Sequence, residues 1–247
     1  MSGFWLPVAT LWWRDLLRFW REKARVVGYV GSPLLFWLLI GSGFGNLAYF
    51  FPGALVLTVM FSAVFSTMSL IEDRREGFLL SMLVSPAPRG SMVLGKILGS
   101  TTLAWIQGAI FLCFLPMAGF RAGAAEVLEA AGVILLVSFT FTALGFVIAW
   151  QMDSTQGFHA VINLLLLPLW LVSGAVFPIA NAHGWVRWLM RLNPVTYSVA
   201  ALRQSFERHA ADAPPFAASL LVTACCAAAL FAASAASARR KSARSFG

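Results

Sequence analysis

The chain has 247 residues, of which 60% are hydrophobic and only 11% are charged. A soluble globular domain carries about 25% charged residues, so this composition excludes an ordinary soluble fold. The formal net charge of +8 does not indicate nucleic-acid binding, because the basic residues stand at the ends of apolar runs and do not form one face of a soluble module.

Apolar runs recur along the chain, and each has the roughly 20 residues that a helix needs to cross a hydrocarbon core. Because lipid offers no hydrogen-bond partners to backbone N–H and C=O groups, each run is expected to be helical. We therefore predict an all-α integral membrane protein with a single domain over residues 1–247. Its six transmembrane helices are placed at 26–44, 50–70, 97–117, 127–150, 158–178 and 215–237.

The segment before the first span, residues 7–25, is predicted to form an amphipathic helix, with apolar residues at helical spacing and charged residues on the other face. A basic, tryptophan-rich helix of this kind lies in the membrane interface. A simple basic topology anchor would look similar, and that alternative stays open. The residues assigned to the interface helix are Trp12, Trp13, Arg14, Arg18, Trp20 and Arg21.

The loop at 71–96 combines a charged run with an apolar stretch, residues 78–84, that is too short to span a membrane. Pro86 and Pro88 end this stretch. We expect a short helix whose apolar surface binds a protein partner or the lipid boundary. A solvated charged loop is the alternative.

The distribution of basic residues predicts the orientation of the chain. Five Lys or Arg residues lie in the N-terminal segment, four in the loop 71–96 and four in the C-terminal tail, out of 18 in the chain. The positive-inside rule therefore places both termini and this loop in the cytoplasm. The loop at 179–214 would then lie outside, with one helix around Trp185 and Trp188, a break at Asn193-Pro194, and a second helix after it.

Sequence patterns that could carry catalysis are incomplete. Residues 90–96 match the start of a phosphate-binding loop, but Ile97 stands where Ser or Thr would bind magnesium, and no strand precedes it. Ser173-Gly174, with His159 and His183, suggests an intramembrane serine protease, but the glycine expected two residues before the serine is Leu171. We expect no catalytic and no metal-binding residues, with the three cysteines acting as small apolar side chains.

No Asp, Glu, Lys or Arg lies near the middle of a predicted span, which argues against a proton-driven transporter or an ion channel. Only Gln107 and Asn163 bring strongly polar side chains to that depth. Either could line a translocation pathway, and interhelical hydrogen bonding explains them equally well.

Two regions resemble the ABC-2 family of exporter permeases. The first has an acidic and basic run, then Met82-Leu-Val-Ser-Pro86, and Gly95-Lys96 entering the next span. Phe78 and Leu80 stand where the family usually has Thr and Glu, so the acidic contact to an ATPase shifts to Glu72, Asp73 or Glu76. The second region contains three motifs in the family's order: Ser173-Gly174-Ala-Val-Phe177-Pro178, Trp185 with Trp188, and Asn193-Pro194-Val-Thr196-Tyr197.

The resemblance implies the membrane-spanning subunit of an ATP-driven exporter in the bacterial inner membrane. It implies a partnership with a second copy of the chain, or a related permease, and with two separately encoded ATPase subunits that bind ATP and magnesium. This chain itself is expected to be no enzyme and to bind no cofactor. The cargo is expected to be a lipid-like, glycan or drug-like amphiphile. A secondary transporter or channel, or an intramembrane enzyme, is the alternative from a different class.

The same resemblance assigns roles to individual residues. ATPase coupling is expected from Glu72, Asp73, Arg74, Arg75, Glu76, Gly77, Phe78, Leu79, Leu83, Ser85, Pro86 and Arg89. An outer gate is expected from Phe177, Pro178, Trp185, Trp188, Asn193, Pro194 and Tyr197.

Overall fold

A computed structural model describes residues 2–21, 23–78, 82, 88–207 and 214–244. Every regular element in this described part is a helix, which confirms the predicted all-α fold class. The elements are α1 (Ser2–Arg21), α2 (Lys23–Gly43), α3 (Leu47–Ser66), α4 (Ser69–Arg75), α6 (Arg89–Leu112), η1 (Leu115–Ala118), α7 (Ala124–Gln151), α8 (Thr155–Leu171), η2 (Ile179–Asn181), α9 (Gly184–Leu192), α10 (Pro194–Phe206) and α11 (Phe216–Arg244).

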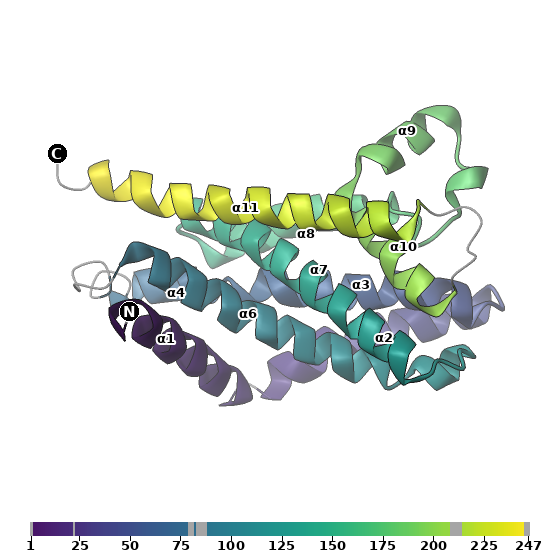
Figure 1. Cartoon of the computed structure of the whole chain (residues 1–247), viewed down its shortest axis with the longest axis horizontal. Coiled ribbons are helices and arrows are strands. Elements are labelled where there is room, and N and C mark those ends of the chain that lie inside the picture. Colours follow the sequence, from purple (N-terminus) through teal and green to yellow (C-terminus); the bar gives the residue numbers. More distant parts are fainter. Residues whose placement is uncertain (1, 22, 79–81, 83–87, 208–213, 245–247) are drawn as a thin grey trace.

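The long helices run side by side along one axis, and α3 is the central one (Figure 1). Of the most apolar stretch of α3, 83% is buried, against 17% in α11. Aromatic rings fill the space between α2, α3 and α6, where Phe51 lies 5.2 Å from Trp37 and 5.4 Å from Phe111 between ring centroids. Burial of large aromatic surfaces therefore holds the centre of the bundle together.

The helix α8 attaches to the bundle through a narrow stripe. Its buried residues recur every fourth position, at Phe158, Ile162, Leu166 and Trp170. Most of its other apolar residues are exposed, with Leu164 at 79%. Such a surface is stable only against lipid or another protein.

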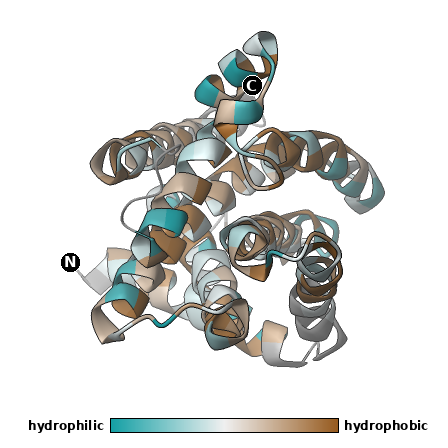
Figure 2. Ribbon diagram, turned by 90° about the vertical axis from the view of Figure 1, so that its right-hand side faces the viewer, coloured by the Kyte–Doolittle hydropathy of each residue, from teal (hydrophilic) through white to brown (hydrophobic). Residues whose placement is uncertain are grey.

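Different helices gather at the two ends of the bundle. The helices α1 and α4 and the C-terminal part of α11 lie at one end, and α9 and α10 lie at the other (Figure 1). Seen from the α9 end, most of the ribbon is hydrophobic, with hydrophilic segments concentrated in a few places, including α9 (Figure 2). The N-terminal helix α1 and the C-terminal part of α11 thus lie at the same end, as an even number of spans would require. Which side of a membrane this end faces stays a prediction.

The six predicted spans correspond to α2, α3, α6, α7, α8 and α11, but their lengths differ from expectation. Helical stretches long and apolar enough to cross a membrane are Leu47–Arg75, Ala124–Gln151 and Phe216–Ala238, and Gly31–Gly43 and Thr155–Leu171 are shorter apolar helices. The predicted span at 158–178 ends early, because the chain turns after Leu171 and Gly174 adopts a φ of +82° that favours glycine. The number of six spans therefore stays a prediction.

Candidate functional site

The helix α1 lies unusually close to α6, because two glycines of α6 face it. A Cβ atom added at Gly95 would lie 3.0 Å from the carbonyl oxygen of Val8, and one at Gly99 would lie 3.2 Å from the Cβ of Asp15. Small residues four apart let two helix backbones approach each other closely. The Trp12 indole also donates a hydrogen bond to Thr102 Oγ1 at 3.0 Å. This packing fixes Asp15 against α6.

Lys96 of α6 lies between two carboxylates from different helices. Its Nζ is 3.0 Å from Asp15 Oδ1 of α1 and 2.5 Å from Asp73 Oδ2 of α4. The three side chains are 3%, 5% and 0% exposed. Charges buried to this degree are tolerated only where they are paired and hydrogen-bonded. Lys96 thus joins α1 and α4 through α6.

Two arginines of α1 complete the pairing with α4. Arg14 donates two hydrogen bonds to Asp73, at 2.6 and 3.2 Å, a bidentate geometry that strengthens an ion pair. Arg18 lies 3.5 Å from Asp73 and 3.0 Å from Glu72. Three cations and three carboxylates therefore meet in one charge cluster, consisting of Arg14, Asp15, Arg18, Glu72, Asp73 and Lys96.

The two buried carboxylates of the cluster differ in their surroundings. Three cations contact Asp73, whereas Asp15 has Lys96 at 3.0 Å and Arg14 only at 4.0 Å. Asp15 Oδ2 is buried and has no hydrogen-bond partner among the described residues. Burial raises the pKa of the Asp15 carboxyl above its ordinary value, although Lys96 opposes this shift.

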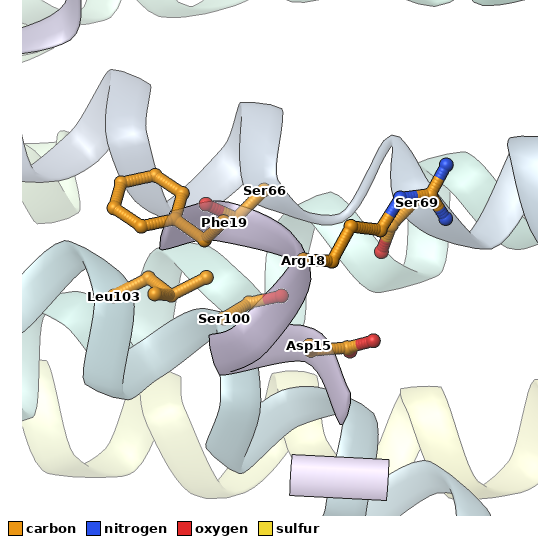
Figure 3. A pocket seen from close by; sticks show the side chains of 7 residues that line it. All are labelled: Asp15, Arg18, Phe19, Ser66, Ser69, Ser100 and Leu103. Atoms are coloured by element: carbon orange, nitrogen blue, oxygen red, sulfur yellow. The ribbon is translucent and has the colours of Figure 1, made fainter. Parts of the chain in front are cut away.

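A small pocket lies next to Asp15 (Figure 3). Its volume is about 20 Å³, enough for one water molecule, and residues of α1, α3, α4 and α6 line it. They are Asp15, Arg18, Phe19, Ser66, Ser69, Ser100 and Leu103. Three serines thus line the pocket beside Asp15, the less well paired of the two buried carboxylates of the charge cluster.

The other side of α4 is held by the junction of α7 and α8. Arg74 donates hydrogen bonds to the carbonyl oxygens of Trp150 and Met152, both at 2.8 Å, and to Asp153 Oδ1 at 2.7 Å. Arg75 Nε donates to the Asp153 carbonyl at 3.1 Å. The short helix α4 therefore has charged contacts with α1, with α6 and with the junction of α7 and α8.

The predicted coupling residues differ in their accessibility. Asp73 is fully buried, so in this conformation it pairs inside the chain and is not available to a partner, whereas the side chain of Glu76 is 59% exposed. Phe78 is half-buried, with the Arg14 guanidinium 3.8 Å above its ring. Gly77 follows α4 with a positive φ, and Arg89 is exposed at the start of α6. Leu79, Leu83, Ser85 and Pro86 lie outside the described residues, as does Leu80, and ATPase docking stays a prediction.

The helix α1 covers residues 7–21 of the interface helix predicted at 7–25, whose residues 23–25 begin α2, and its faces are arranged differently from the predicted pattern. The charged residues Arg14, Asp15 and Arg18 turn inward toward α4 and α6, while Trp13 and Leu17 are exposed. These side chains turn inward because α4 and α6 supply residues of opposite charge, which pair with them in place of water. Lys96, which directly precedes the span predicted at 97–117, is buried within α6. The side chains of Trp20 and Arg21 lie outside the described part.

The predicted outer-gate residues gather at the other end of the bundle. Asn193 is buried, donates to the carbonyls of Leu169 and Val172 at 2.5 and 2.9 Å, and accepts from Val195 N at 3.0 Å. It therefore ties the end of α8 to the start of α10, where Pro194 occupies the first turn. Tyr197 donates to the Arg191 carbonyl at 2.8 Å.

The aromatic residues of this end face outward. Trp185 and Trp188 are exposed on α9, and Phe177 and Pro178 are half-buried in the turn before η2. Exposed tryptophans on an amphipathic helix suit a membrane–water boundary. Their role as a gate stays a prediction.

The two possible pathway residues occupy opposite environments. Gln107 is fully buried, and neither atom of its amide has a hydrogen-bond partner in the described part of the chain. Asn163 is exposed on the outward face of α8.

Of the incomplete catalytic patterns, residues 90–96 form the first turns of α6, and Ser173 Oγ donates to the Trp170 carbonyl at 2.6 Å.

Sequence reasoning missed Asp15 and Asp153 as site residues. The signal for Asp15 was available, because the spacing of Gly95 and Gly99 marks a close helix contact next to a basic residue. Asp153 had no such signal, because its partner Arg74 lies 79 positions away in the chain.

The sequence profile of the ABC-2 type transporter family matches residues 7–206. The chain belongs to this family. It is 26% identical over 205 residues to Nodulation protein J of Rhizobium leguminosarum bv. trifolii, which covers 77% of this chain and 78% of the relative. It is 25% identical over 206 residues to a probable doxorubicin resistance ABC transporter permease protein, DrrC, of Mycobacterium tuberculosis, with 77% and 73% covered.

A third relative is the putative transport permease ycf38 of Cyanophora paradoxa, 27% identical over 197 residues, with 74% of this chain and 68% of the relative covered. Family membership makes the chain a membrane permease subunit of an ABC transporter, a class that associates with an ABC ATPase. The charge cluster contains Lys96 of the Gly-Lys pair, one of the motifs by which the chain resembles this family.

Proposed function

We propose that this chain is the membrane-spanning subunit of an ATP-driven exporter in the bacterial inner membrane, with both termini cytoplasmic. Two copies, or this chain and a related permease, form the pathway, and two ATPase subunits drive it. The whole chain, residues 1–247, acts as one transmembrane domain with six spans. The observation that carries the proposal is that α4, next to the predicted docking segment, is tied by buried charges to α1 and α6.

The charge cluster lets α4 transmit force from an ATPase to membrane helices. Separating Lys96 from its carboxylates would leave buried, unpaired charges, and breaking such a pair costs about 3–5 kcal/mol. A push on α4 therefore moves α1 and α6 with it before the cluster opens. Glu76 and Arg89, which are exposed beside α4 and at the start of α6, are available for contacts at the rim of an ATPase interface.

An amphiphilic cargo is supported by an apolar groove between α2, α3 and α8. The groove has a volume of about 340 Å³, and aromatic and aliphatic side chains dominate its lining, which includes Phe36, Phe61, Phe65, Leu167 and Trp170. Lipid tails and drug-like rings suit such a surface. The name of the mycobacterial relative, which refers to doxorubicin resistance, is in keeping with a cargo of this kind.

A second permease copy is supported by the exposed face of α8. Asn163 lies on this face among apolar residues, and an amide exposed to lipid is unfavourable unless it finds a hydrogen-bond partner. Contact with a second copy would supply that partner and cover the exposed leucines.

The proposal is tested by co-expressing the chain with an ABC ATPase from the same genome and isolating the complex from native membranes. We expect the two proteins to co-purify and the complex to hydrolyse ATP. Failure of every encoded ABC ATPase to associate with the chain would contradict the proposal.

A further inference from the structure

Arg74 of α4 lies outside the charge cluster and connects α4 to a different part of the bundle. Among the described residues it forms no ion pair with α1 or α6, and its guanidinium instead reaches the carbonyl groups of Trp150 and Met152 at the end of α7 and the side chain of Asp153 in the turn to α8. Carbonyl groups at a helix C-terminus lack partners within the helix, and a cation there is stabilised by the helix dipole. Arg74 therefore closes the end of α7 and holds the turn that begins α8.

The helix α8 is held at its two ends and weakly in between. At the α9 end, the Trp170 indole donates to the Gly53 carbonyl at 2.7 Å, and Asn193 binds the last carbonyls of α8. At the α4 end, Ser154 caps the helix by accepting from Gly157 N, directly after Asp153. Between these ends the described contacts of α8 are mainly those of its buried stripe, together with the His159 ring, which lies 4.7 Å from the Phe65 ring between centroids.

We propose that Arg74 is a positioning residue that passes a displacement of α4 to the start of α8, so that α8 moves relative to α3 when the ATPase acts. The inference rests on the proposed function, in which α4 receives that displacement. Three hydrogen bonds from one planar guanidinium constrain both the distance and the direction between α4 and the α7–α8 turn. A helix fixed by one stripe and anchored at its far end tilts when its near end is pulled.

Pro168 adds a place where α8 can bend. Its ring removes the backbone hydrogen bond to Leu164, close to the Trp170 anchor. Movement of the α4 end would therefore change the groove lined by Leu167 and Trp170. Arg74 in this way connects the ATPase-facing end of the chain with the surface proposed to bind cargo.

The test uses the assembled complex of this chain with its ATPase, in lipid nanodiscs. An environment-sensitive fluorophore is attached to Leu164→Cys, at a leucine of α8 that is 79% exposed, after replacement of Cys113, Cys225 and Cys226 by serine. The ATP-dependent change in its emission is compared between the parent, Arg74→Ala and Arg74→Lys. Gln151→Ala is the matched control, because Gln151 is exposed beside the same turn and its side chain donates to the Val147 carbonyl within α7.

We expect Arg74→Ala to keep the ATPase bound and ATP hydrolysis measurable but to lose the emission change, and Arg74→Lys to restore part of it through one charged contact. Gln151→Ala should behave as the parent. A full emission change in Arg74→Ala, or no change in the parent complex, would overturn the inference. Loss of ATPase binding in Arg74→Ala would also overturn it, because Arg74 would then be a docking residue. Absence of any ATPase complex with the parent would instead refute the proposed function.

Discussion

Replacing Lys96 by methionine tests the energetic role of the charge cluster. Lys96→Met keeps a similar side-chain length and removes the charge that lies 3.0 Å from Asp15 and 2.5 Å from Asp73. Asp73 retains Arg14 and Arg18, so the penalty falls mainly on Asp15, which would be left buried without a close cation. Removing one partner of a buried pair costs about 3–5 kcal/mol, and we expect a destabilisation in this range.

The double variant Lys96→Met/Asp15→Leu is the matched control. Removing both members of a buried pair is much less costly than removing one, because no uncompensated charge remains. Thermal unfolding of the purified chain in detergent should therefore show a large decrease for Lys96→Met and recovery of most of it in the double variant. Equal melting temperatures for the single and double variants would refute the energetic link between Lys96 and Asp15.

Further predictions concern pH, catalysis, docking and assembly. Because the folded-state pKa of Asp15 is raised, the folded chain binds more protons than the unfolded chain between the ordinary value of 3.8 and the raised one, so lowering the pH through this window should stabilise the parent relative to Asp15→Asn. A parent and variant with parallel pH–stability curves would contradict this. The chain purified without partners should hydrolyse no ATP above background, and ATP-saturable turnover would count against the proposed division of labour. Leu79→Asp and Leu83→Asp should each insert normally but lose both ATPase association and transport, because a charge in an apolar contact is costly; survival of both functions would place docking elsewhere. Cross-linking in native membranes should trap a dimer of permease chains, and a strictly monomeric chain that still transports with its ATPase would exclude the proposed assembly.

The parts of the fold that were predictable are those that local sequence signals determine. Apolar runs of sufficient length identified the long helices, because lipid and helix geometry together restrict what such runs can form. Asn193-Pro194 marked the boundary between α9 and α10, because asparagine caps a helix and proline fits its first turn.

The lengths of two helices were not predictable from hydropathy. The predicted span at 158–178 counted an apolar turn as helix, although the helical part ends at Leu171. The helix α6 begins at Arg89, before its apolar run, because buried contacts with α1 and α4 make a charged helical turn stable there. Hydropathy describes whether an isolated side chain prefers water or an apolar environment. It does not describe a charged side chain that is paired with an opposite charge inside the chain.

The composition of the charge cluster was only partly predictable. Charged residues at 72–76 were recognised as functional candidates, but Asp73 was expected to face a partner and is buried. The decisive contacts join residues 59 to 81 positions apart, such as Arg14 with Asp73 and Lys96 with Asp15. No periodicity in a single sequence specifies such pairs. In the sequence, a charged residue that is paired inside the fold looks the same as one that is solvated at the surface.

We propose that an ABC ATPase binds at the α4 end of this permease, and photo-cross-linking at Glu76 in native membranes tests this binding most directly. Glu76 directly follows α4 and is exposed, whereas Trp185, at the opposite end of the bundle, serves as the control position. We predict that a photo-reactive residue at position 76 forms an adduct identified by mass spectrometry as an ABC ATPase, and that one at position 185 does not. An ATPase adduct from position 185 and none from position 76 would contradict the account.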